Sequence, residues 1–174
     1  MDWKVIDEGY LNYLRSYESR IPFSNYGEDK YKPFFGALFD LNDEISYITQ
    51  ISHPQKRHYT LKASKDFKKV YDKRNNQLLC VVNLNYMFPV PKKCMESLNY
   101  DRIEEHRSFS DETEKSKYIF LLKRELAALN KMGLEAAAES IYEEKRLYPE
   151  SRLSQRCFDF AALDELCRLY GSPA

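Results

Sequence analysis

The stretch KPFFGALFDLNDEISYITQI, residues 32–51, decides the fold because it contains two apolar runs separated by a turn. The runs, Pro33 to Leu41 and Ile45 to Ile51, are rich in the aromatic and β-branched residues that strands favour. Asn and Asp at positions 42 and 43 are typical turn residues. The pattern predicts an antiparallel β-hairpin.

The next seven residues, SHPQKRH at 52–58, bring together a hydroxyl, two imidazoles and two cations. Pro54 disfavours a regular helix or a central strand, so we expect a loop at a strand end. The outer ends of a hairpin are neighbours, so Lys32 should lie close to Ser52 and His53. Loops on a rigid scaffold often carry function. The corner formed by Lys32, Ser52 and His53 is therefore the candidate site. The preceding polar loop, residues 21–31, adds two tyrosines beside this corner, Tyr26 and Tyr31.

Strand patterns dominate the first half of the chain and helical patterns the second half. Strands are predicted at Trp3–Ile6, Phe67–Tyr71, Gln77–Asn85 and Met87–Val90, and a helix is predicted after Asp7. Further helices are predicted at Lys115–Lys131, at Leu134–Leu147 and after Asp159. This order favours an α+β fold. We expect one domain, residues 1–174, in which helices cover a strongly twisted antiparallel sheet or partial barrel.

The charge is balanced overall but unevenly distributed. Lys and Arg number 27, as do Asp and Glu. Residues 52–74 nevertheless contain eight cations and two acids, whereas residues 99–114 contain six acids and two arginines. A basic segment of this kind is a typical footprint for a polyanion, although a solvated surface of mixed charge is the simpler reading.

Several classes of protein are disfavoured. The four cysteines form no CxxC pair, and the five glycines form no phosphate-binding loop, so neither a zinc site nor a nucleotide-dependent enzyme is expected. His53 and His58 could hold a metal ion, but no third ligand is near them in the sequence. There is no signal peptide or long apolar run, so we expect a soluble, cytoplasmic protein without membrane contact.

The candidate corner suits RNA cleavage without a metal ion or cofactor. Such cleavage requires a base for the 2′-hydroxyl, an acid for the 5′-leaving oxygen and cations for the phosphate. Free histidine has a pKa of about 6.5, so it can serve either role near pH 7. His53 and His58 are therefore candidates, although a hydrogen-bonded loop histidine without catalytic function is the commoner case.

Several segments, taken in order, resemble a known family. They are Tyr10 with Leu14, Lys32–Gly36, Tyr47–His58, VNLNYMFPV at 82–90, Tyr118 with Leu121 and Leu122, and 158–170. The chain resembles the ToxN/AbiQ family of type III toxin–antitoxin endoribonucleases over almost its whole length. The resemblance implies a fold related to MazF and Kid toxins and metal-independent, sequence-selective cleavage that leaves a 2′,3′-cyclic phosphate.

The resemblance also implies partners. A short repeated RNA, processed by the toxin and folded into pseudoknots, would inhibit the enzyme within a closed protein–RNA assembly. Cellular or phage mRNA would be the substrate, and the outcome would be growth inhibition and phage defence.

Site residues follow from the resemblance position by position. Lys32 matches the active-site lysine of the family, Ser52 stands where a threonine is common, and His53 replaces a frequent serine. The predicted catalytic residues are Lys32, Ser52, His53, Lys56 and Tyr26. The predicted RNA contacts are Tyr31, Arg57, His58, Lys62, Lys65, Lys68, Lys69, Tyr118 and Lys123. Two alternatives remain, namely a non-catalytic RNA-binding module and a protein–protein scaffold.

Overall fold

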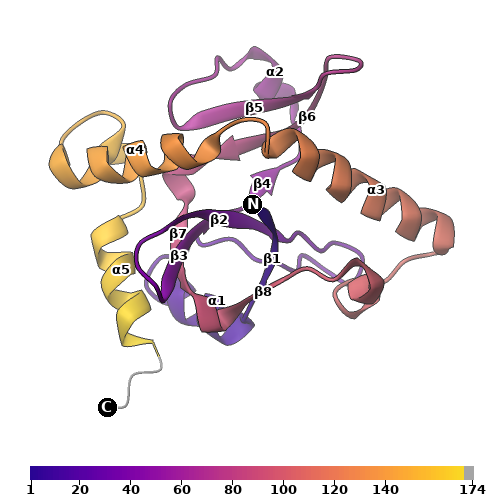
Figure 1. Ribbon diagram of the computed structural model, residues 1–174, viewed down its shortest axis with the longest axis horizontal. Coiled ribbons are helices and arrows are strands. Elements are labelled where there is room, and N and C mark those ends of the chain that lie inside the picture. Colours follow the sequence, from indigo (N-terminus) through magenta and orange to yellow (C-terminus); the bar gives the residue numbers. More distant parts are fainter. Residues whose placement is uncertain (171–174) are drawn as a thin grey trace.

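The computed structural model describes residues 1–170, which form two antiparallel sheets flanked by helices (Figure 1). The larger sheet has the strand order β7-β3-β2-β1-β8, and the smaller sheet has the order β4-β6-β5. The strands are β1 (Asp2–Ile6), β2 (Phe34–Asp40), β3 (Ile45–Thr49), β4 (Ile51–Ser52), β5 (Phe67–Asp72), β6 (Gln77–Asn83), β7 (Phe88–Pro91) and β8 (Met95–Ser97). The helices are α1 (Glu8–Arg15), α2 (Lys56–Thr60), α3 (Glu112–Leu129), α4 (Leu134–Leu147) and α5 (Phe160–Leu169). Short 3₁₀ turns are η1 (Leu84–Tyr86), η2 (Lys92–Cys94), η3 (Tyr100–Glu105) and η4 (Ser154–Arg156).

The predicted hairpin is confirmed as β2 and β3, but its second strand is divided between the two sheets. Phe39 faces Tyr47 in the larger sheet, whereas Ile51 and Ser52 pair with β6 in the smaller one. The break falls at Gln50, whose side-chain amide donates to the carbonyl oxygens of Phe23 (2.7 Å) and Lys32 (3.2 Å). The chain thus crosses between the sheets beside Lys32.

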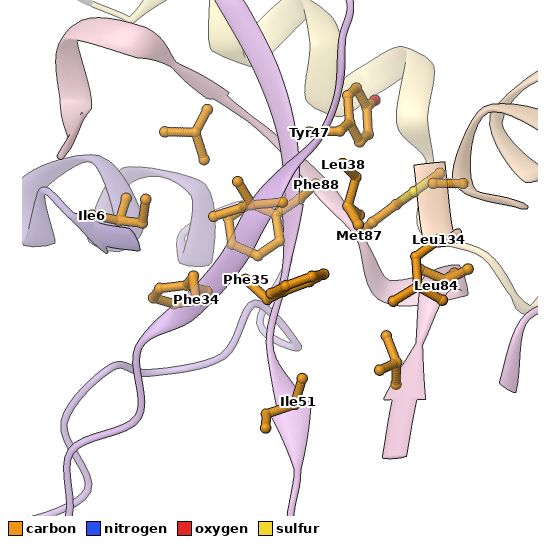
Figure 2. Packing of buried hydrophobic residues seen from close by; sticks show 14 of the residues in the cluster. Ile6, Phe34, Phe35, Leu38, Tyr47, Ile51, Leu84, Met87, Phe88 and Leu134 are labelled. Carbon is orange, nitrogen blue, oxygen red and sulfur yellow. The ribbon is translucent and has the colours of Figure 1, made fainter. Parts of the chain in front are cut away.

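One hydrophobic core joins both sheets to the helices. Figure 2 shows Phe34 and Phe35 of β2 gathered with Ile51 of β4, Leu84 of η1 and Leu134 of α4. Complete burial of a side chain of this size contributes roughly 1.5–3 kcal/mol. Helix α4 packs on β2, α5 on β7 and α3 on β5. The sheet corner that carries residues 32 and 52 is therefore fixed from several directions.

The predicted helices are confirmed, with shifts at their ends. Asp7 and Asp159 cap α1 and α5, and their carboxylates accept hydrogen bonds from the backbone N–H groups of Tyr10 (2.8 Å) and Ala162 (3.2 Å). Helix α3 begins three residues before the predicted start because the Asp111 carboxylate caps it. The predicted α+β architecture is confirmed, and in the described part of the chain, residues 1–170, the two sheets do not close into a barrel.

One local prediction was partly wrong, and one strand was not predicted. The expected loop at 52–58 includes the start of α2 at Lys56, because Pro54 precedes the helix, where proline does not interrupt its hydrogen bonds. Strand β8 was not predicted, since its three residues gain their order from pairing with β1. Over residues 1–170, no helix combines the length and apolar character needed to span a membrane.

Candidate active site

A cleft of about 350 Å³ opens where the chain passes from the larger to the smaller sheet. Its lining combines the predicted corner with the polar loop before β2 and the turn after β6. The lining residues are Arg20, Pro22, Tyr26, Lys32, Thr49, Gln50, Ser52, Asn83 and Tyr86.

Lys32 is anchored through its backbone, while its side chain faces the cleft. Its N–H donates to the carbonyl oxygen of Ser24 (2.7 Å), and its own carbonyl accepts from Gln50. The ammonium nitrogen lies 5.1 Å from the centroid of the Tyr26 ring, within cation–π range. Among residues 1–170, no carboxylate forms a salt bridge with Lys32. Its charge therefore remains available to an anionic ligand.

The structure brings Lys32, Ser52 and His53 to one corner, as the hairpin pattern predicted. Ser52 lines the cleft with Lys32, and His53 lines a small cavity of about 20 Å³ that also includes Lys32. The His53 side chain is 49% exposed, and its Nδ1 lies 3.6 Å from Oε1 of Glu125 on α3. A cation, a hydroxyl and an imidazole thus meet around one strand end.

The two loop tyrosines have different environments. Tyr26 is 45% exposed beside Lys32, and its hydroxyl donates to Oε1 of Gln50 (3.1 Å). Burial raises the pKa of Tyr26, so its hydroxyl stays protonated at neutral pH. Tyr31 is buried and stacks on His106, and its carbonyl accepts from the Tyr118 hydroxyl (2.7 Å). Tyr26 is therefore better placed to meet a ligand, while Tyr31 and Tyr118 support the wall behind it.

The three residues at 56–58 differ in their exposure to solvent. Lys56 and Arg57 are exposed, and Lys56 lines neither the cleft nor the small cavity. His58 is buried, and its Nδ1 accepts from the backbone N–H of Gln55 (3.1 Å), so it belongs to the cap of α2. Burial, followed by the charges of Arg57 and Lys69, lowers the pKa of His58. The His58 imidazole thus serves the start of α2, and its predicted contact with RNA stays a prediction.

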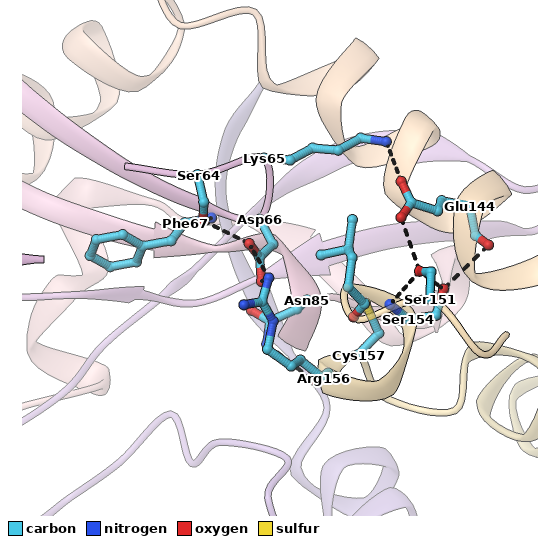
Figure 3. A network of polar contacts seen from close by, with 11 residues as sticks. Ser64, Lys65, Asp66, Phe67, Asn85, Glu144, Ser151, Ser154, Arg156 and Cys157 are labelled. Atoms are coloured by element: carbon cyan, nitrogen blue, oxygen red, sulfur yellow. Dashed lines mark hydrogen bonds and ion pairs between the residues drawn. The ribbon is translucent and has the colours of Figure 1, made fainter. Parts of the chain in front are cut away.

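Ion pairs hold part of the basic segment against the C-terminal half (Figure 3). Lys65 pairs with Glu144 of α4 (2.6 Å), and Arg156 of η4 pairs with Asp66 (3.0 Å). Lys69 donates to the carbonyl of Tyr59 (3.3 Å). Lys62 is exposed and Lys68 is half-buried on β5, whereas Lys123 lies over the Tyr100 ring at 5.1 Å, outside both cavities. The segment thus presents fewer unpaired cations than its sequence suggests.

Sequence reasoning missed Arg20, Asn83 and Tyr86 in the cleft, and Glu125 beside His53. Asn83 and Tyr86 belong to the quoted motif at 82–90, which could have marked them. Glu125 left a clearer signal, since an acid at that helical position interrupts an apolar stripe. Among residues 1–170, no group of three or more His, Cys, Asp or Glu side chains is arranged to hold a metal ion.

The fold is similar to those of several known structures. Among curated proteins, none is significantly similar to the chain in sequence. One similar solved structure comes from a study of bacterial type III toxin–antitoxin systems, in which a non-coding RNA pseudoknot selectively inhibits the toxin. It has 22% identity and a TM-score of 0.76, and the match covers 98% of both chains.

Two further solved structures are similar. One belongs to a bacterial antiviral system regulated by a processed non-coding RNA (18% identity, TM-score 0.76, 99% of this chain and 100% of that chain). The other is AbiQ, a lactococcal anti-phage endoribonuclease of a type III toxin–antitoxin system (18% identity, TM-score 0.74, 97% and 96%).

The family profile described as "Toxin ToxN, type III toxin-antitoxin system" matches residues 3–168, which is nearly the whole chain. The resemblance seen in the sequence is thereby confirmed, and the chain belongs to the ToxN family of type III toxin–antitoxin systems.

Proposed function

We propose that the protein is a metal-independent, sequence-selective endoribonuclease toxin that acts in the cytoplasm. The observation that carries this proposal is the meeting of Lys32, Ser52 and His53 at one corner, where Lys32 lines both the cleft and the His53 cavity. Family membership and the endoribonuclease AbiQ among its structural relatives support the reaction class.

The proposed reaction is an internal transfer at phosphorus. The 2′-oxygen attacks the phosphorus, the bond to the 5′-oxygen breaks, and a 2′,3′-cyclic phosphate remains. His53 exchanges a proton with the reacting oxygens, because an imidazole can accept or donate one near neutral pH. Lys32 stabilises the charge of the phosphate oxygens, and Ser52 orients the scissile group by hydrogen bonding. Tyr26 holds Lys32 in place and offers a neutral hydroxyl to the substrate.

The rest of the cleft suits a single-stranded RNA. Tyr26 and Tyr86 are 45% and 42% exposed, and bases stack favourably on exposed aromatic rings. Arg20 lies 5.9 Å from the Tyr86 centroid, and its guanidinium is paired with Glu18 at 2.6 Å. Asn83 adds an amide group that can bond to base edges. We assign Lys56, outside the cleft, to a flanking phosphate.

The proposed partner is a repeat-derived RNA antitoxin that the protein processes and that inhibits it in a closed protein–RNA assembly. Structural relatives include a toxin inhibited by an RNA pseudoknot and an antiviral system regulated by a processed RNA. The exposed cations Arg57 and Lys62 would contribute to phosphate contacts with this RNA. Cleavage of cellular or phage mRNA would inhibit growth and limit phage infection.

A growth assay tests this function. Expression of the wild-type protein in bacteria without an antitoxin should arrest growth and fragment cellular RNA. Lys32→Ala and His53→Ala should each restore growth at equal protein level, whereas Lys30→Ala, an exposed lysine in the same loop, should remain toxic. Full toxicity of both active-site variants would refute the assignment. If the wild-type protein binds RNA but leaves it intact, the non-catalytic RNA-binding module becomes the better description.

A further inference from the structure

Glu125 is a buried acid that the reaction described above does not use. It lies on α3 with 0% exposure, at helical spacing from the buried Leu122 and Leu129. Within residues 1–170, neither of its carboxylate oxygens has a hydrogen-bond partner. Buried polar groups are normally hydrogen-bonded, so an acid kept in this apolar position calls for a partner.

The surroundings of Glu125 point to His53 as that partner. The two side chains line the same small cavity, and Nδ1 of His53 lies 3.6 Å from Oε1 of Glu125. Lys32, Tyr31 and Tyr118 line the same cavity, but none of them hydrogen-bonds to Glu125.

A further titratable group near Glu125 is the thiol of Cys80 on β6. Burial, and secondly the charge of Glu125, raise the pKa of the Cys80 thiol well above its ordinary value. This thiol is therefore neutral and competes weakly for the carboxylate. Among residues 1–170, His53 is the one basic side chain within ion-pair distance of Glu125.

We propose that Glu125 is a positioning residue that accepts a hydrogen bond from Nδ1–H of His53 and thereby leaves Nε2 of that imidazole as the proton acceptor. This inference rests on the ribonuclease function proposed above. The present separation is longer than a hydrogen bond, but His53 is half-exposed and catalytic hydrogen bonds often tighten when substrate binds. A buried carboxylate that selects the tautomer and orientation of a catalytic imidazole is a recurring device in enzymes.

The arrangement also explains how one loop histidine could work as a base. An imidazole on a surface loop samples several rotamers and both neutral tautomers. Glu125 is fixed by α3, which is tied to β1 through a hydrogen bond from Trp3 Nε1 to the carbonyl of Leu122 (2.9 Å). The helix therefore holds the acceptor still, while His53 remains accessible to the RNA.

The tautomer of His53 provides a test that does not depend on activity. Long-range ¹H–¹⁵N spectra distinguish the Nδ1–H form from the Nε2–H form, and His53→Gln identifies the signal among the three histidines. Wild-type protein should show mainly the Nδ1–H form at a pH where the imidazole is neutral. Glu125→Met, which keeps length and suits an apolar site, should lose that preference. Glu139→Met, which removes an exposed glutamate of α4, should retain it.

Kinetics complete the test. Glu125→Met should lower kcat by about 10²-fold, within the range for loss of general-base function, with KM nearly unchanged. Glu125→Gln retains an acceptor oxygen, so it should recover part of the rate, and it carries the test if the Met variant fails to fold. An unchanged His53 tautomer and an unchanged kcat in these variants would overturn the inference. If Glu125→Met changes the His53 tautomer but the wild-type protein cleaves no RNA, the contact between His53 and Glu125 is supported and the proposed ribonuclease function is refuted.

Discussion

Lys32→Ala removes the charge that we assign to the reacting phosphate, and the structure sets the scale of its effect. No carboxylate within residues 1–170 pairs with Lys32, so its charge is not neutralised before RNA binds. Two unit charges about 4 Å apart interact by about 4 kcal/mol at an effective dielectric constant of about 20. That energy corresponds to about 10³ in rate, and loss of one transition-state donor typically costs about 10²–10³ in kcat.

Single-turnover cleavage of a fluorescent RNA at pH 7 measures this effect. We expect a rate about 10²–10³-fold below wild type for Lys32→Ala, with an unchanged thermal midpoint. Lys30→Ala is the matched control, because it removes the same charge from an exposed site two residues away. A Lys32→Ala rate within about threefold of wild type, or an equal loss in the control, would show that Lys32 does not stabilise the reacting phosphate.

Three further predictions concern stability and RNA affinity. Gly36→Ala should destabilise the fold by about 1–3 kcal/mol in urea unfolding, because its Cβ would lie 2.6 Å from a side-chain carbon of β3; wild-type stability would contradict this packing. The pKa of Asp72 is lowered, mainly because its carboxylate accepts a hydrogen bond from the backbone N–H of Arg74. The ionised carboxylate therefore stabilises the folded state at a pH above its unfolded pKa. This stabilisation is lost as the pH falls through the lowered pKa of the folded state. Asp72→Asn should therefore be less stable than wild type at pH 7, and the gap should close in acid below pH 3.8; a gap that persists there would exclude this cause. Lys62→Ala should reduce the slope of log affinity for RNA against log salt by about 0.7–0.9, whereas Lys115→Ala, whose lysine is paired at 2.9 Å, should leave the slope unchanged; equal slopes in all proteins would remove Lys62 from the interface.

The sequence predicted those features that depend on local pattern. The hairpin of β2 and β3 has apolar runs and a turn within 20 residues, and hairpin geometry alone placed Lys32 beside Ser52. The caps at Asp7 and Asp159 were equally predictable, because a capping side chain bonds to its own first helical turn. The family resemblance supplied a function for this corner but not its geometry.

Features that depend on distant parts of the chain could not be predicted. The transfer of the chain between sheets at Gln50 depends on carbonyl groups of Phe23 and Lys32. Lys65 of the basic segment is neutralised by an ion pair with Glu144, which lies far along the chain. Likewise, the proximity of Glu125 to His53 could not be predicted, because it results from the packing of α3 and the two residues are over 70 positions apart in sequence.

RNA cleavage in EDTA, followed by identification of the new ends, measures whether the protein is a metal-independent ribonuclease that uses Lys32 and His53. Purified protein and a single-stranded RNA are incubated without divalent metal, and the products are examined by mass spectrometry. We expect continued cleavage to 2′,3′-cyclic phosphate and 5′-hydroxyl ends, and both Lys32→Ala and His53→Ala should abolish it. Cleavage that requires Mg²⁺ or leaves 5′-phosphate ends, or the absence of any cleavage, would contradict this expectation.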